Sequence, residues 1–142
     1  MTETVTLVGA GPGGAELLTR GGGAALRQAD AVVYDRLVDE SILDLIPKGA
    51  ERICVGKKMG HHPVPQDEIN ALLVHLARQG KRTVRLKGGD CYLFGRGGEE
   101  CEYLKAHGVP FRVLPGVTSA LAAPAFAGIP VTHRDFCSSV HI

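Results

Sequence analysis

The stretch that decides the fold begins Val84-Arg85-Leu86-Lys87-Gly88-Gly89-Asp90 and continues Cys91-Tyr92-Leu93-Phe94-Gly95-Arg96-Gly97-Gly98-Glu99-Glu100. Its first residues suit a buried strand, and two glycines and a carboxylate then end that strand in a loop. Adjacent glycines let a backbone approach a ligand without interference from Cβ atoms, and open α/β sheets bind ligands at the carboxyl ends of their strands. Glu99 and Glu100 then fall in the first turn of a predicted helix, where acidic side chains complement the dipole. Taken alone, a Gly-Gly-Asp segment indicates only a glycine-rich turn.

Outward from this stretch, strand and helix patterns alternate. Apolar runs predict strands over residues 5–8, 31–34, 52–55, 83–86 and 111–114, with another beginning at 138–142. Helices are expected over residues 15–28, 39–45, 65–79, 99–106 and 118–127. The triple glycine Gly21-Gly22-Gly23 weakens the first of these helices, because each glycine costs ~1 kcal/mol relative to alanine. The alternation predicts an α/β fold, with a mostly parallel sheet and helices on both faces.

Composition excludes several classes of protein. A length of 142 residues suits one domain, and a net charge of +1 offers no general attraction for nucleic acid. No apolar run approaches the ~20 residues needed to cross a bilayer and no signal peptide opens the chain, so we expect a cytoplasmic protein without a membrane partner. The four cysteines form no Cys-x-x-Cys pair, which argues against a zinc site and a disulfide framework. The adjacent pair His61-His62 lacks further spaced ligands, so no metal is predicted.

One motif favours a dinucleotide. Gly9, Gly11 and Gly14 satisfy G-x-G-x-x-G after a strand, and Asp35 lies about where a ribose-binding acid is found in such proteins. This alternative predicts an NAD- or FAD-binding oxidoreductase domain. It leaves the stretch from residue 87 to residue 100 unexplained, and the triple glycine weakens the helix that would bind the pyrophosphate. A third alternative is a non-catalytic α/β interaction module.

Ordered motifs run along nearly the whole chain: Val8-Gly9-Ala10-Gly11-Pro12-Gly13, Val33-Tyr34-Asp35-Arg36-Leu37-Val38, Val55-Gly56-Lys57-Lys58, His61-His62, Val64-Pro65-Gln66-Asp67-Glu68-Ile69-Asn70, Leu86-Lys87-Gly88-Gly89-Asp90, Phe94-Gly95-Arg96-Gly97-Gly98-Glu99-Glu100, Pro115-Gly116-Val117-Thr118-Ser119 and Ala127-Gly128-Ile129-Pro130-Val131-Thr132-His133-Arg134-Asp135. Together they resemble the tetrapyrrole methylase family. The Tyr-Asp-Arg-Leu-Val segment is similar to the branch that methylates uroporphyrinogen III to precorrin-2, for sirohaem and cobalamin synthesis, rather than to relatives acting on rRNA or on later corrinoids.

The chain departs from the family pattern in three ways. Gly14-Ala15 stands where the family usually has Asp followed by Pro, and this change completes the glycine motif while removing a helix cap. Cys91 stands where the family usually has Pro, which leaves the loop less fixed in shape. Family members also carry a second α/β domain, so residues 1–142 are expected to be the N-terminal domain of a two-domain enzyme and to have little activity alone.

The resemblance implies that S-adenosylmethionine binds in the cleft between two domains. The positions that match its binding residues are Pro12, Gly88, Gly89, Asp90, Leu93, Thr118 and Ser119. A sulfonium cation suits carbonyls and a carboxylate, while ribose and ammonium groups suit Asp90 and adenine suits Leu93 and small residues. For Leu93 and Ser119 taken singly, ordinary packing is an equal alternative.

The resemblance also implies the roles of a proton acceptor, Asp35, and a proton donor, Lys57. Methylation of a pyrrole carbon needs positioning and a base, since the ring loses a proton afterwards. Taken singly, Asp35 would be a loop cap and Lys57 a solvated surface lysine. The substrate is a polycarboxylate, and the basic residues expected to bind it are Arg36, Lys58, His61, Arg96 and Arg134. The family is usually homodimeric.

Overall fold

The apolar runs of the sequence form one parallel sheet. The computed structural model describes residues 1–56 and 62–142. Its strands are β1 (Val5–Gly9), β2 (Ala31–Tyr34), β3 (Glu51–Cys54), β4 (Thr83–Lys87) and β5 (Phe111–Leu114). They lie in the order β3-β2-β4-β1-β5, and each of these strands pairs in parallel with its neighbours. All carboxyl ends of the strands therefore meet at one edge, as the alternation of elements predicted.

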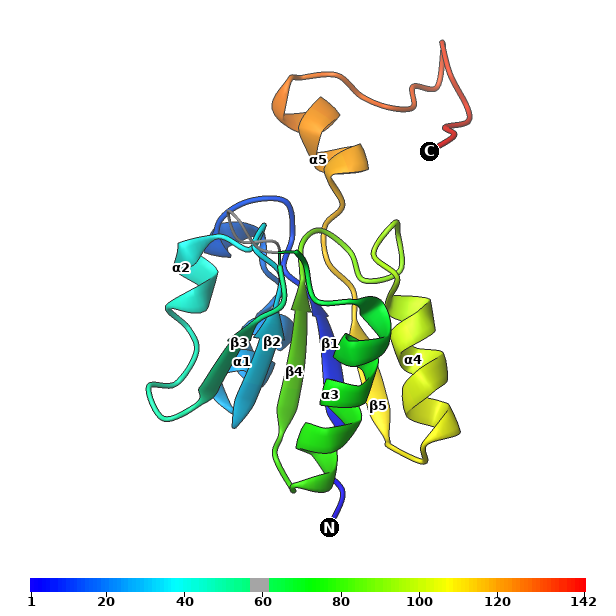
Figure 1. Cartoon of the computed structure of the whole chain (residues 1–142). Coiled ribbons are helices and arrows are strands. Elements are labelled where there is room, and N and C mark those ends of the chain that lie inside the picture. Colours follow the sequence, from blue (N-terminus) through cyan, green and yellow to red (C-terminus); the bar gives the residue numbers. More distant parts are fainter. Residues whose placement is uncertain (57–61) are drawn as a thin grey trace.

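Helices cover both faces of this sheet (Figure 1). Helices α3 (Gln66–Arg78) and α4 (Gly97–Ala106) pack with Val5 and Leu7 of β1 in one buried cluster. Helices α1 (Arg20–Arg27) and α2 (Glu40–Leu43) belong to the opposite cluster, which contains Val8. Side chains alternate along each strand, so neighbouring residues of β1 belong to different cores. The predicted fold class is confirmed.

The helix expected over residues 15–28 is divided. A 3₁₀ turn, η1 (Ala15–Leu17), ends in the extended backbone of Leu18, and α1 begins only after Thr19. The Thr19 hydroxyl accepts a hydrogen bond from Gly22 N at 3.0 Å, so the new helix starts with a side-chain cap. A Cβ atom on Gly22 would lie 2.9 Å from Val8 Cγ1, so this glycine lets α1 approach the sheet closely. The triple glycine thus lies in the first turn of a shorter helix.

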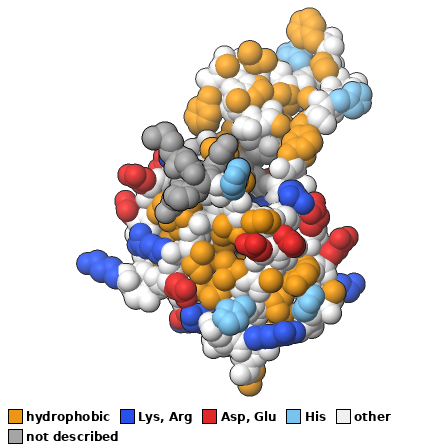
Figure 2. Space-filling view, in the orientation of Figure 1, with side chains coloured by type: hydrophobic (Ala, Val, Ile, Leu, Met, Phe, Trp, Pro, Cys, Tyr) orange, Lys and Arg blue, Asp and Glu red, His pale blue; other side chains and the backbone are white. Residues whose placement is uncertain are grey.

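The last part of the chain extends away from the sheet. Helix α5 (Ser119–Phe126) stands beyond the carboxyl ends of the strands, and the segment after it continues outward (Figure 1). Apolar side chains gather on this part (Figure 2), and Phe126, Ile129 and Phe136 are among the exposed ones. The strand expected at residues 138–142 is wrong: these residues are irregular and lie outside the five-stranded sheet, whose strands would have to pair with them.

Two further expectations concern the thiols and the membrane. All four cysteines are free, as their scattered positions predicted. None of the helices built from the described residues has the length and apolar character needed to cross a bilayer.

A charged pair joins two strands at the amino edge of the sheet. Asp30 precedes β2 and Arg82 precedes β4. The Asp30 carboxylate accepts hydrogen bonds from Arg82 Nε, Nη2 and backbone N, each at 2.9 Å. The hydrogen bond from the Arg82 side chain, followed by that from its backbone, lowers the pKa of Asp30 from 3.8 to about 2.

This pair predicts a pH-dependent stability. A carboxyl whose pKa is depressed in the folded state stabilises the fold above its unfolded pKa, and that contribution is lost as pH falls through the folded pKa. Asp30→Asn should therefore lower the thermal unfolding midpoint at neutral pH. This difference in midpoint from the parent protein should disappear as the pH falls from 3.8 to about 2. Because the pair is exposed to solvent, we expect a small gap. Glu102→Gln, on the exposed surface of α4, is the control, and a gap that does not vary with pH would contradict the prediction.

Candidate functional site

A cavity of about 660 Å³ lies at the carboxyl edge of the sheet. The loops after β1, β2 and β4 form its walls, together with the first turns of α5. Its volume suits a small organic ligand, since such sites are typically ~300–1,000 Å³. All seven residues predicted to bind a cofactor line it: Pro12, Gly88, Gly89, Asp90, Leu93, Thr118 and Ser119. The structure thus brings together residues that span most of the chain.

Backbone contacts between glycines hold together the chain segments that follow β1, β4 and β5. Gly11 and Gly89 exchange hydrogen bonds, with N···O distances of 3.1 and 2.8 Å. A Cβ atom on Gly9 would lie 2.5 Å from Gly116 N, and one on Gly116 would overlap the Gly89 carbonyl oxygen. The ends of β1, β4 and β5 therefore approach so closely that no side chain fits between them.

Asp90 fixes the shape of this loop. Its Oδ1 accepts a hydrogen bond from Gly116 N and its Oδ2 accepts one from Tyr92 N, both at 3.0 Å. The carboxylate therefore already ties the β4 loop to the loop after β5. Each carboxylate oxygen can accept a further bond, so the predicted contact with ribose or ammonium stays a prediction.

The loop then winds around Cys91. This side chain is fully buried, and its carbonyl accepts a hydrogen bond from Gly97 N at 3.0 Å. Phe94 and Arg96 adopt left-handed backbone conformations, with φ of 52° and 56°. Burial raises the pKa of the Cys91 thiol to about 12, so it is not a nucleophile at neutral pH. Packing and backbone hydrogen bonds hold this loop at the position where the family usually has a proline.

Asp35 lies at the cavity wall, directly after β2, and is bound to a buried arginine. Arg85 Nη2 donates to Asp35 Oδ1 at 2.9 Å, with Asp35 32% exposed and Arg85 only 2% exposed. Behind it, Glu100 Oε1 accepts hydrogen bonds from Arg85 Nε and Lys87 Nζ, each at 3.0 Å. Asp35 is therefore the solvent-accessible member of a group of charged side chains that is otherwise buried.

Sequence reasoning missed this group. Arg85 and Lys87 occupy alternate positions of a strand that is buried on both faces, where charged residues are rare unless paired. That pattern was the available signal, and it calls for a buried carboxylate elsewhere. Glu100, expected only to complement a helix dipole, is that carboxylate.

The remaining predicted site residues, the proton donor and the substrate-binding residues, do not line the cavity or are not described. Lys57, Lys58 and His61 lie outside the described residues. Arg36 is exposed beside Asp35, Arg96 pairs with Glu99 at 2.7 Å on the surface, and Arg134 is exposed after α5. None of these three lines the cavity, so their binding of substrate stays a prediction. Two apolar residues that sequence reasoning missed do line it, Leu37 and Phe94, and both are strongly exposed.

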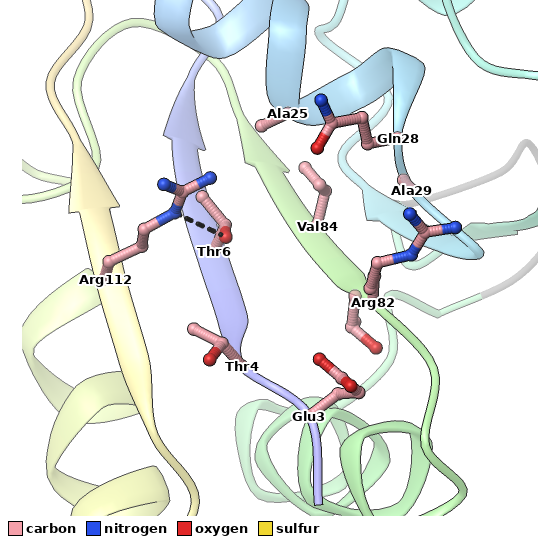
Figure 3. A pocket seen from close by; sticks show the side chains of 10 residues that line it. Glu3, Thr4, Thr6, Ala25, Gln28, Ala29, Arg82, Val84 and Arg112 are labelled. Carbon is pink, nitrogen blue, oxygen red and sulfur yellow. Dashed lines mark hydrogen bonds between the residues drawn. The ribbon is translucent and has the colours of Figure 1, made fainter.

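A smaller hollow of about 220 Å³ lies toward the amino ends of the strands (Figure 3). Its two arginines are already engaged, because Arg112 Nε donates to Thr6 Oγ1 at 3.1 Å and Arg82 is paired with Asp30. Open α/β sheets bind ligands at the opposite edge. We therefore take the cavity at the carboxyl edge as the candidate site. Within the described part of the chain, no three acidic, histidine or cysteine side chains gather as a metal site would require.

The sheet order does not support the dinucleotide alternative. In dinucleotide-binding sheets the first two strands are neighbours, so the acid after the second strand faces the glycine loop after the first. Here β4 lies between β1 and β2. A 3₁₀ turn also follows the glycine loop in place of the α-helix that would bind pyrophosphate. The G-x-G-x-x-G match is thus an accident of Gly14.

Comparisons with known proteins agree with this geometry. Residues 4–141 match the model of the tetrapyrrole (corrin/porphyrin) methylases. The chain is 60% identical over 136 residues to siroheme synthase 1 of Serratia proteamaculans (strain 568), covering 96% of this chain but only 29% of that protein. It is similar to the crystal structure of uroporphyrin-III-C-methyltransferase from Thermus thermophilus, with a TM-score of 0.84, 46% identity and coverage of 94% of this chain and 56% of that one. A structure of that enzyme complexed with S-adenyl homocysteine matches with a TM-score of 0.78 and 48% identity, covering 96% of this chain and 53% of that one.

The glycine contacts predict a sharp difference between two substitutions. Gly116→Ala would place a methyl group on the Gly89 carbonyl oxygen, where only backbone can yield. Forced overpacking costs ~1–3 kcal/mol, so the thermal unfolding midpoint should fall by several degrees. Gly98→Ala is the matched control, because it meets no atom within 4 Å and lies in α4, where alanine favours the helix. Equal midpoints for the two variants would show that the loops are not in such close contact.

Proposed function

Because the chain belongs to the tetrapyrrole methylase family, we propose that it forms part of an S-adenosylmethionine-dependent C-methyltransferase that acts on uroporphyrinogen III. The resemblance found in the sequence motifs is thereby confirmed at the level of the family. The observation that carries the proposal is that Asp35 and all seven predicted cofactor-binding residues line the same cavity. The proposed product is precorrin-2, the precursor of sirohaem and cobalamin.

The residues of the cavity fit the proposed cofactor. Gly89 has a left-handed backbone, with φ of 63°, and no side chain to occupy the space beside it. Leu93 offers an apolar surface for adenine, and Thr118 and Ser119 are small. When bound, S-adenosylmethionine supplies an electrophilic methyl group. The chain then has to hold both reactants in line and remove one proton.

Asp35 is the proposed proton acceptor. It lies at the cavity wall and one of its oxygens, Oδ1, is bound by Arg85. Attack of the pyrrole carbon on the methyl group would break the methyl–sulfur bond and release S-adenosylhomocysteine. The Asp35 carboxylate would then accept the proton that the tetrapyrrole ring system loses. Lys57 remains the proposed proton donor, although it lies outside the described residues.

The chain spans only 29% of the length of the curated relative and 56% of the solved methyltransferase. We propose that residues 1–142 form the N-terminal domain of a two-domain methylase and supply one wall of the cleft. Exposed apolar residues beside the cavity, including Val117 and Leu121, support a second wall from another part of the complete protein. A homodimer and a cytoplasmic location stay predictions.

Ligand choice tests the proposed function. In the complete protein, isothermal titration calorimetry should detect binding of S-adenosylhomocysteine and none of NAD or FAD at the same concentrations. The reason is that β4 lies between β1 and β2 and a 3₁₀ turn follows the glycine loop, unlike in a dinucleotide site, while all seven predicted cofactor-binding residues line one cavity. Binding of NAD without S-adenosylhomocysteine would overturn the proposal.

Asp35→Asn separates base chemistry from packing. Asparagine keeps the size of the side chain and still accepts from Arg85, but it takes up no proton. General base catalysis is typically worth ~10²–10⁴ in rate, so kcat for methylation should fall by that factor while S-adenosylhomocysteine affinity stays nearly constant. Asp39→Asn is the control, because Asp39 caps α2 outside the cavity and asparagine caps equally well. Near-normal turnover of Asp35→Asn would remove Asp35 as the proton acceptor.

A further inference from the structure

Five polar side chains meet behind the cavity wall, between the sheet and the helices of one face. Glu100 from α4 accepts at Oε1 from Arg85 and Lys87 of β4, at 3.0 Å each, and from Gln66 Nε2 of α3 at 3.2 Å. Arg85 then connects this cluster to Asp35 after β2. The exposed fractions of the Glu100, Arg85 and Lys87 side chains are 0%, 2% and 4%.

Stability alone does not account for this cluster. Each buried charge costs several kcal/mol in lost hydration, and well-packed apolar residues of similar volume are often as stable as a buried ion pair. Two cations and two anions are present, so the charges balance while Asp35 is ionised. Glu100 Oε2 is buried with no hydrogen-bond partner among the described residues, so the cluster is not optimised for stability.

The contacts of Arg85 show that the cluster fixes the orientation of its guanidinium group. Its Nε donates to Glu100 and its Nη2 to Asp35, while its Nη1 lies 3.4 Å from the carbonyl oxygens of Val33 and Leu86. Contacts on all three nitrogens fix both the position and the plane of the guanidinium. A planar group held in this way fixes the direction from which it binds a carboxylate.

We propose that Arg85 is a positioning residue, which holds the Asp35 carboxylate by Oδ1 in one orientation at the cavity wall and is itself oriented by Glu100. The proposal rests on the proposed function, in which Asp35 accepts the proton. Without Arg85, the half-buried Asp35 side chain would be free to adopt several rotamers at the end of β2. Arg85 removes that freedom. A base that is already held in the productive geometry loses less conformational entropy when the transition state forms.

The test is a double-mutant cycle in the complete protein. Arg85→Lys keeps the positive charge beside Glu100 but loses the planar guanidinium, which binds Glu100 and Asp35 at the same time. We expect kcat to fall ~10–10²-fold, because small misplacements of reacting groups cost that much, with S-adenosylhomocysteine affinity within about twofold. On the Asp35→Asn background the same change should add less than about threefold, since the base it positions is already gone. A full multiplicative loss there would overturn the positioning role.

Control variants separate positioning from folding. Arg82→Lys makes the same substitution in an exposed ion pair away from the cavity and should leave kcat unchanged. If Arg85→Lys does not fold, Arg85→Gln replaces it in the cycle, because it removes the guanidinium while Lys87 still compensates the Glu100 carboxylate and Asp35 stays partly exposed. On the Asp35→Asn background its loss in kcat should likewise fall to less than about threefold.

The two proposals fail in different ways. If Asp35→Asn lowers kcat while Arg85→Lys and Arg85→Gln leave it unchanged, the positioning role is wrong and the base assignment stands. If Asp35→Asn turns over normally, the base assignment is wrong and the positioning role falls with it. Loss of S-adenosylhomocysteine binding in Arg85→Lys would instead mean that Arg85 supports the cofactor part of the cavity.

Discussion

The structure depends on a carboxylate that has no contact with water. Glu100 lies in the first turn of α4 and accepts from β4 twice and from α3 once, so a single oxygen joins three elements. Removing it would leave the buried Lys87 without its carboxylate and Arg85 paired with Asp35 alone, which is far costlier than losing a surface ion pair. The same contacts lead through Arg85 to Asp35. The interaction that holds α4 and α3 against the sheet is therefore continuous with the candidate site.

The sheet order explains why the site lies where it does. With β4 at the centre and β1 and β2 on either side, the loops after all three strands open onto one cavity. The loop after β4 carries the two glycines and Asp90, and the neighbouring loops carry Pro12 and Asp35. Parallel strands alone would give a shared edge, but only this order puts Asp35 next to β4 and its buried cations.

Sequence reasoning succeeded where local signals agree with tertiary structure. The strands at residues 31–34 and 111–114 have the predicted bounds, because short apolar runs suit a sheet buried on both faces.

The division of the helix expected at 15–28 is not predictable, because no local sequence signal marks the extended backbone of Leu18. The strand at 138–142 failed because pairing is non-local. The grouping of Pro12, Gly89 and Thr118 came from family resemblance, since nothing in their spacing along the chain brings them together. The Arg85–Glu100 contact is not predictable from local patterns, because it joins β4 to α4 through packing that neither segment shows by itself.

The glycine contacts at the cavity divide its wall into two kinds of position. Where Gly9, Gly89 and Gly116 touch through their backbones, a Cβ atom either overlaps a neighbour or requires a left-handed conformation. The loops after β2 and β4 carry Leu37 and Phe94 at their tips, and these side chains line the cavity and are 90% and 84% exposed. Saturation mutagenesis of this wall should therefore yield new ligand preferences at the tips and none at the glycines. In a redesign of the cavity for a different ligand, the residues at the loop tips can therefore be varied, whereas the glycines have to be kept.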